Sequence, residues 1–402
     1  MNIKKSKIII AGILAVVSCQ SFSIEKNDLY LNADSRGISP FNDYVNYIDS
    51  DDEDIRRGAL SNIIRGSVSN NHYKFIYSVM NMYGENPSGN LDYQYILESL
   101  AFKEGYTLAY SYLGDLYIDK GDVDKGLSVF VRGVDRNDDR SSFLLGNFYR
   151  DGKYVEQSNY YAIQNYLKVK SSKYIGEARY QAALLELSLN NNSTHFKLMI
   201  DAANSGNIKA CLSLINLYKG EYKKSDKTGS LLLKYIQCAV DGGESQLAFD
   251  LAEYYYNGYI VDTDIKKANL YYEIYYNYII TNNIKVNRDV LHKIAVSRMR
   301  TGVGGSTDLF LEASSMGNYE SSYVMGKVYE NGAIGDVDFN SAYRYYQLSK
   351  EQGKVGVEVD IERVKQFIVE DNDSVLKEVQ NNDDNISTND VESSTGEIVD
   401  IY

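Results

Sequence analysis

A spacing of small, apolar and aromatic residues returns along most of the chain and restricts what it can fold into. In each copy a small residue is followed two positions later by an apolar residue and then by tyrosine, and a glycine closes the copy. The clearest copies are Leu113–Tyr117 with Gly121, Leu145–Tyr149 with Gly152, and Met325–Tyr329 with Gly332. Weaker copies lie at 81–84, 215–220 and 251–258. Such a repeat predicts a series of similar supersecondary units along one axis.

A second segment follows the closing glycine and carries alanine with aromatic residues three and four positions later. Ala268–Tyr272 and Ala342–Tyr346 fit this pattern, and Tyr161–Tyr166 is a weaker copy. Residues three and four apart share one helical face, where glycine or alanine admits a second helix and tyrosine fills the seam. Only two prolines interrupt the chain, which favours long helices. Each unit is therefore expected to be a helical hairpin that buries its apolar face against its neighbours.

The second of these segments completes a resemblance to the sel-one-like repeat (SLR) family, a branch of the tetratricopeptide-like helical superfamily. The family pattern is roughly L-G-x-x-Y-x-x-G, then K-A-x-x-Y-Y, then A-x-x-x-G, and residues 322–353 and 258–272 match it best. The resemblance covers 67–353 as about seven repeats, and it implies an all-α chain folded as a right-handed α/α superhelix. Two segments, 174–205 and 288–317, match poorly.

The resemblance also carries expectations about function. It implies a bacterial exported protein that is not an enzyme and that binds protein or peptide partners, as a scaffold or adaptor in envelope secretion or exopolysaccharide assembly. A secreted factor that binds a host or a competitor is the alternative. A third reading, a peptidoglycan- or β-lactam-binding enzyme like those proposed for cysteine-rich relatives, finds no catalytic group in this sequence.

A candidate binding surface follows from the same resemblance. In tetratricopeptide-like proteins the position after the small residue of the first helix lies on the ligand-facing concave wall. Here these positions, called the first row, are Asn81, Asp115, Asn147, Asn216, Glu253 and Lys327. Of the positions one helical turn later, the candidate binding residues are Asp119, Asp151, Asn257 and Asn331, called the second row. Amides can hold a peptide backbone through a donor and an acceptor, and the acids favour a basic or neutral extended ligand. The alternative is the ordinary solvated face of an amphipathic helix.

The first residues resemble an export signal. Three lysines at positions 4, 5 and 7 precede the apolar run Ile8–Val17, which is too short to span a bilayer as a stable anchor. Two cleavage sites are compatible with the sequence. A lipobox-like Val16–Cys19 would remove 1–18 and place a lipid on Cys19, whereas Ser21–Ser23 would allow removal of 1–23. The mature chain is thus expected in the periplasm, anchored to the outer membrane, or secreted.

The flanks of the repeats differ from the repeats themselves. Residues 24–66 are expected to form an N-terminal segment and helical cap, with acids at 49–54 preceding a helix at 55–64. Residues 354–369 are expected to form a C-terminal cap helix. Residues 370–402, rich in Asn, Asp and Ser, are expected to be a disordered acidic tail, which ends either in a short docking motif or in plain flexible chain.

Two cysteines are candidates for a disulfide. Cys211 lies near the start of a first helix and Cys238 near the end of its partner, and these ends are neighbours in an antiparallel hairpin. Export would allow the bond to form. The alternative is two buried free thiols.

Charge and motifs exclude several classes of function. A net charge of -13 repels phosphate backbones, so nucleic acid is not an expected partner, and a membrane contact is expected only through a lipid on Cys19. The three histidines show no metal-ligand spacing, so neither a metal nor another cofactor is expected. The glycines of Gly302–Thr307 are expected to form a turn rather than a phosphate loop, and Asp122, Asp264 and Asp338 are expected to cap helices.

Overall fold

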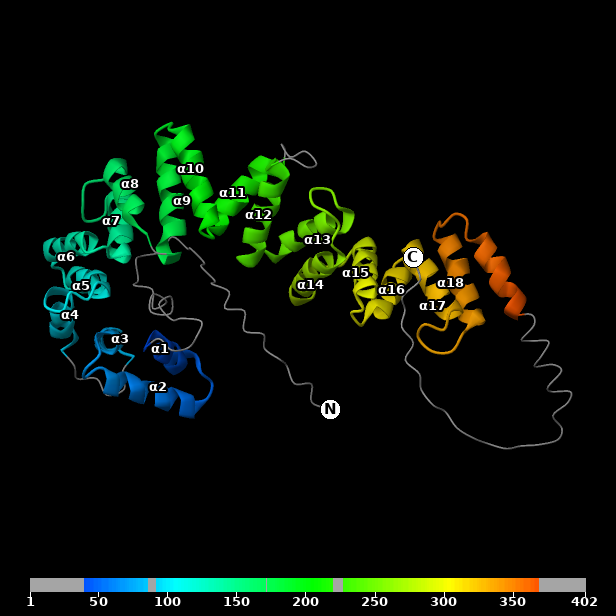
Figure 1. Ribbon diagram of the computed structural model, residues 1–402, viewed down its shortest axis with the longest axis horizontal. Helices are drawn as coiled ribbons and strands as arrows, with labels where there is room; N and C mark the ends of the chain where they lie inside the picture. The colour runs from blue at the N-terminus through cyan, green and yellow to red at the C-terminus, as the bar shows by residue number, and fades with distance from the viewer. Residues whose placement is uncertain (1–39, 86–91, 171, 220–226, 369–402) are drawn as a thin grey trace. The chain divides into compact units, whose positions relative to one another are not determined.

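The computed structural model describes residues 40–85, 92–170, 172–219 and 227–368 (Figure 1). All regular structure in these ranges is helical, as the repeat pattern predicted. The expected leader, Cys19 and the expected acidic tail lie outside the described residues. None of the described helices is both long and apolar enough to cross a membrane.

The chain divides into two compact units, Met1–Leu214 and Ile215–Tyr402. The helices of the first unit are α1 (Pro40–Asp49), α2 (Glu53–Gly66), α3 (Asn71–Met82), α4 (Tyr93–Phe102), α5 (Leu108–Asp119), α6 (Val123–Asp135), α7 (Asp139–Asp151), α8 (Asn159–Lys168), α9 (Ser172–Ser188) and α10 (Asn192–Asn204). Helix α11 (Ile208–Lys219) contains the boundary. The second unit continues with α12 (Lys227–Asp241), the 3-10 helix η3 (Ser245–Leu247), α13 (Ala248–Asn257), α14 (Ile265–Thr281), α15 (Arg288–Thr301), α16 (Ser306–Ser315), α17 (Tyr319–Glu330) and α18 (Phe339–Glu351).

Consecutive helices pack as hairpins in both units. In the first unit the most extensive contacts join α5 with α6, α7 with α8 and α9 with α10. In the second unit they join α13 with α14, α15 with α16 and α17 with α18. The two segments that match the family pattern poorly, 174–205 and 288–317, therefore form hairpins as well. Ala183 and Ala295 stand there where the family pattern has glycine, and both are fully buried.

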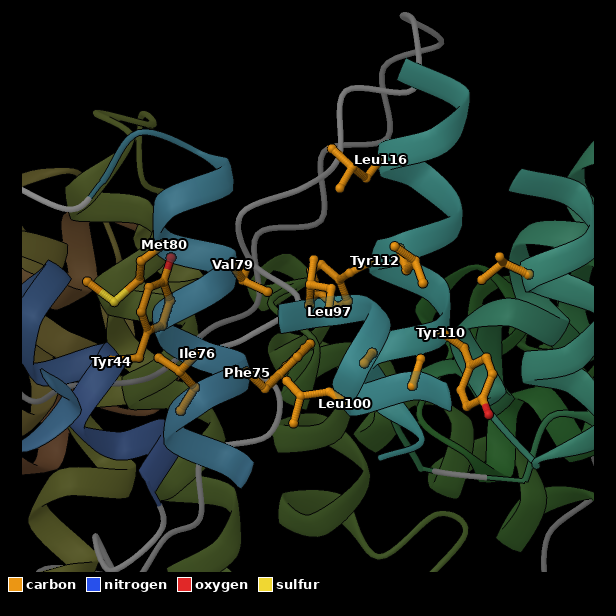
Figure 2. Close-up of a cluster of buried hydrophobic side chains, with 14 of the residues drawn as sticks. Tyr44, Phe75, Ile76, Val79, Met80, Leu97, Leu100, Tyr110, Tyr112 and Leu116 are labelled. Atoms are coloured by element: carbon orange, nitrogen blue, oxygen red, sulfur yellow. The ribbon is translucent and has the colours of Figure 1, made fainter. Parts of the chain in front are cut away.

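The core of the first unit is continuous from α1 to α6. Figure 2 shows Phe75, Ile76 and Val79 of α3 beside Leu97 and Leu100 of α4, with Tyr112 of α5 in the same cluster. The Phe75 and Tyr112 rings meet edge to face, with centroids 5.1 Å apart. Burying such aromatic and branched side chains is the main favourable contribution to packing a hairpin on its neighbour.

Helix ends follow the local signals in the sequence. Gly152 ends α7 in the left-handed conformation, at φ 64°, which glycine adopts without strain. Asp264 and Asp338 cap α14 and α18, because each carboxylate accepts a backbone N–H three residues later. Asp122 precedes α6, but its side chain makes no capping hydrogen bond. The glycines at 302–305 form the turn between α15 and α16, as predicted.

The second unit ends in a further helical segment. Residues 358–368 are helical and lie within the range expected to close the repeats. Val357, Ile361 and Val364 are buried against Ala342 and Tyr346 of α18. The apolar side of this segment thus continues the packing of the last hairpin.

Candidate functional site

A tyrosine ring lies directly on the glycine of the first helix in the α7–α8 hairpin. A Cβ atom added at Gly146 would lie 2.6 Å from two ring carbons of Tyr166, so only glycine permits this approach. The Tyr166 hydroxyl donates a hydrogen bond of 2.7 Å to Oδ1 of Asn147, which is 5% exposed. Burial raises the pKa of the Tyr166 hydroxyl, so it stays a donor at neutral pH. This first-row residue is therefore part of the seam inside its own hairpin.

The other first-row residues of the first unit are also engaged. Nη1 of Arg140 lies 2.6 Å from Oδ2 of Asp115, and the two side chains are only 7% and 12% exposed. The Arg140 guanidinium also lies over the Tyr112 ring, 4.5 Å from its centroid. Because Asp115 is on α5 and Arg140 on α7, this ion pair ties one hairpin to the next. Asn81 donates from Nδ2 to the Tyr77 carbonyl of its own helix, at 2.7 Å.

The first row of the second unit shows a related arrangement at Glu253. Its Oε1 accepts a hydrogen bond of 2.5 Å from the Tyr272 hydroxyl of α14. Its Oε2 lies 2.7 Å from Nζ of Lys293 on α15. Lys327 on α17 lies over the Tyr323 ring at 5.1 Å, whereas Asn216 on α11 is exposed.

The α17–α18 hairpin repeats the glycine–tyrosine contact with a different acceptor. A Cβ atom at Gly326 would lie 2.6 Å from two ring carbons of Tyr346. The next residue is Lys327, which has no acceptor to offer. The Tyr346 hydroxyl donates instead to Oε2 of Glu330 at 2.5 Å, and Arg363 donates to both carboxylate oxygens of Glu330 at 2.8 and 2.9 Å. Burial by itself would raise the pKa of Glu330, but these hydrogen bonds outweigh it and the pKa is lowered.

The second row lies at the surface. Asp119, Asp151, Asn257 and Asn331 are all exposed. Arg150 donates to both carboxylate oxygens of Asp151, at 2.7 and 2.8 Å. Asn257 donates to the Glu253 carbonyl at 3.0 Å, which leaves its amide oxygen for other donors. The two rows therefore differ, because Asp115, Asn147 and Glu253 of the first row are held by contacts to other helices, whereas the second row faces solvent.

Sequence reasoning expected tyrosines in the seams but missed their hydrogen-bond partners, since Tyr166 and Tyr272 donate to first-row residues and Tyr346 donates to Glu330. Tyr166, Tyr272 and Tyr346 each stand twenty residues after the small residue of their hairpin, and this fixed spacing was available in the sequence. Arg140 and Lys293 have no such signal, since they come from the following hairpin.

The remaining candidate groups are dispersed. Nδ1 of His72 lies 2.8 Å from the Tyr106 hydroxyl, Nδ1 of His195 lies 2.8 Å from the Ala183 carbonyl, and His292 is on α15. Over the described ranges no three His, Cys, Asp or Glu side chains gather in a way that would hold a metal ion.

Cys211 and Cys238 are each disulfide-bonded, and their pairing with each other stays a prediction.

Comparisons with known proteins give likenesses at low identity. No family model matches the chain, and no curated protein matches it. The chain is similar to the solved structure of c5321, a protective antigen present in uropathogenic Escherichia coli strains that displays an SLR fold. The identity is 15%, the TM-score is 0.38, and 76% of this chain and 67% of that one are covered. It is also similar to a Sel1 repeat protein from Oxalobacter formigenes, with 18% identity, a TM-score of 0.34, and coverage of 66% and 78%.

Proposed function

We propose that this chain is an exported, non-enzymatic scaffold that binds protein or peptide partners through the second row. The observation that supports this is the difference between the rows. First-row side chains such as Asn147 and Glu253 are held by hydrogen bonds inside the hairpins, whereas second-row side chains are polar and exposed on the same helices. A ligand can therefore meet the second row without opening a hairpin seam.

The chemistry of the second row indicates an extended basic or neutral ligand. In the first unit this row is acidic, at Asp119 and Asp151, and in the second unit it carries the amides of Asn257 and Asn331. Carboxylates attract basic side chains, and amides pair with a peptide backbone as donor and acceptor. The net charge of -13 favours partners of neutral or positive charge.

Site-specific photo-crosslinking in the native host tests this proposal. A benzophenone amino acid is placed at Asp119 or Asn257, and matched controls carry it at Val131 and Leu270, which are 51% and 55% exposed on the second helices α6 and α14. We expect a discrete protein adduct from the second-row positions and none from the controls. Adducts from the control positions alone would place the binding surface elsewhere and contradict the proposal.

The location of the mature chain is a second part of the proposal. The basic residues and the apolar run at 4–17 support export, to an envelope complex for secretion or exopolysaccharide assembly. Intact-mass analysis of the protein from its native host decides the form. A mass that begins at Cys19 with acyl chains supports a membrane-anchored scaffold. A mass that begins at Ile24 without lipid favours a secreted host- or competitor-binding factor, and an uncut N-terminus overturns export by either route.

A further inference from the structure

His292 lies where two hairpins of the second unit meet. Its ring is edge-on to Phe310 of α16, with centroids 5.7 Å apart. Its Nδ1 atom lies 2.9 Å from Oγ of Ser321 on α17, a residue with no solvent exposure. The imidazole thus contacts both its own hairpin, α15–α16, and the following one, α17–α18.

Two polar contacts from the first turn of α15, just before His292, show that it belongs to a joint between the hairpins. Nη1 of Arg288 donates to the Gly317 carbonyl at 2.8 Å, and Nδ2 of Asn318 donates to Oδ1 of Asp289 at 2.8 Å. Both contacts span 29 residues, as does the contact from His292 to Ser321. The equal separation indicates one continuous register. We call these three contacts the hairpin joint.

The charges that face His292 balance one another. Asp289 and Lys293 come from its own helix, Glu320 from α17, and Lys354 from the segment after α18. Glu320 lies 2.9 Å from Lys354, and Lys293 lies 2.7 Å from Glu253, so these charges already have partners. α16 contributes the apolar Phe310 ring. With two acids and two lysines nearby, burial decides the balance, and it lowers the pKa of His292.

Protonation would change the hydrogen bond to Ser321. A neutral imidazole can accept at Nδ1 from the Ser321 hydroxyl, or donate to it, according to the tautomer. The imidazolium can only donate from Nδ1, which requires the buried Ser321 hydroxyl to act as acceptor and to direct its own hydrogen elsewhere. The added charge would also lie between packed helices, where an ion is poorly solvated.

We propose that His292 makes the hairpin joint acid-sensitive, so that its protonation loosens the packing of α17 on α15 and α16. The neutral ring fits the joint, and the charged ring is accommodated better when the joint opens to water. An open state binds the proton more readily than the closed one, so acid shifts the population toward opening. This property goes beyond partner binding and holds whatever the ligand is.

Hydrogen exchange of the full chain at pH 7.5 and pH 5.0 tests the proposal, with rates corrected for the intrinsic effect of pH. At pH 5.0 the charged form of an imidazole with an ordinary pKa outnumbers the neutral form by about thirtyfold. This ratio sets the upper limit of the fall in protection. We expect protection of 306–330 to fall between about threefold and this limit in the wild type. The fall should be absent in His292→Gln, whose amide stays neutral. His195→Gln is the matched control and should keep the fall.

Three outcomes overturn the proposal. These are unchanged protection in the wild type, the same fall in His292→Gln, or loss of the fall in His195→Gln. If His292→Gln does not fold, a titration of the wild type followed by NMR of its ring-labelled histidines decides instead. His292 is then assigned by elimination with variants of the other two histidines. A His292 pKa below the ordinary value of about 6.5 supports the proposal, and one at or above it overturns it.

Discussion

The α7–α8 hairpin of the first unit and the α17–α18 hairpin of the second have the same seam with different hydrogen-bond acceptors. In each, a tyrosine ring lies against a helical glycine, at 2.6 Å from an added Cβ atom. The Tyr166 hydroxyl donates to Asn147 in one hairpin, and the Tyr346 hydroxyl donates to Glu330 in the other. The close approach of the helices is therefore the fixed feature. The acceptor varies as long as the buried hydroxyl has one.

The first-row residue shows why the acceptor differs. Asn147 follows its glycine and can accept, whereas Lys327 in the same position cannot. The second hairpin therefore uses Glu330, one turn further along the helix and held by Arg363. First-row positions are thus free to differ in chemistry because the seam finds another partner.

The largest expected effect comes from the buried ion pair of Asp115 and Arg140, which joins α5 to α7 and lies outside both seams. Asp115→Asn would remove the carboxylate that lies 2.6 Å from the Arg140 guanidinium, in a pair whose side chains are only 7% and 12% exposed. We expect a loss of about 3–5 kcal/mol in the free energy of unfolding, measured by urea denaturation followed by circular dichroism. Asp54→Asn, which breaks a pair whose side chains are 70% and 88% exposed, is the control. It should stay within about 1 kcal/mol of the wild type. Equal effects of the two changes would contradict the account.

The glycine–tyrosine contact is the next feature to break. Gly146→Ala and Gly326→Ala each place a Cβ atom against a buried ring, and we expect each to destabilise by about 1–3 kcal/mol. Gly58→Ala on α2 meets nothing within 4 Å, so it should stabilise by up to about 1 kcal/mol. Thermal or urea unfolding of the three variants decides. If Gly146→Ala matches Gly58→Ala, the ring does not lie on the glycine.

Removing the tyrosine hydroxyl from each seam tests the role of its acceptor, and we expect a smaller loss of stability than from the glycine variants. Tyr166→Phe leaves the buried Asn147 oxygen without its donor, so we expect a loss of about 1–2 kcal/mol. Tyr346→Phe leaves Glu330 with both hydrogen bonds from Arg363, and we expect a loss of stability of about 0.5–1 kcal/mol. The exposed Tyr259 serves as control, since Tyr259→Phe should change nothing measurable in the same unfolding assay. The reverse order of the first two variants would show that the acceptors are not as described.

Lowering the pH should distinguish the two seams, and the resulting change in stability is the smallest of the expected effects. The pKa of Glu330 is lowered in the fold, so its contribution to stability is present above the ordinary pKa of about 4.5 and is lost as pH falls through the folded value. The stability difference between the wild type and Glu330→Gln should therefore shrink below about pH 4.5. Asn147 does not titrate, so the difference between the wild type and Asn147→Ala should not change there. Unfolding midpoints from pH 3 to 7 give both curves.

The sequence predicts the helices and hairpins better than the contacts of the candidate site. Gly152 and Asp338 mark helix ends through local chemistry, and both predictions are confirmed. The partner of Asp115 depends on the register between consecutive hairpins, because Arg140 stands 25 residues away. No local pattern encodes that register. The same holds for the contact of His292 with Ser321.

The Tyr166 contact is an intermediate case. Its ring position follows from the repeat, because Tyr346 stands at the same distance from its own glycine. Its effect on Asn147 does not follow, since a helical wheel gives no information on whether an amide faces solvent or a hydroxyl. The first row therefore resembled a ligand surface in sequence although most of its side chains have partners within the chain.

The most direct test of this division between rows combines stability and partner capture in one unit. A photo-crosslinking residue at position 151 reports capture, and Asp119→Ala and Asn147→Ala are compared beside it. We expect Asp119→Ala to reduce capture and to leave the unfolding midpoint unchanged. We expect Asn147→Ala to lower stability by about 1–2 kcal/mol and to retain capture in the folded protein. Loss of capture from Asn147→Ala at unchanged stability, with full capture from Asp119→Ala, would show that the rows do not divide in this way.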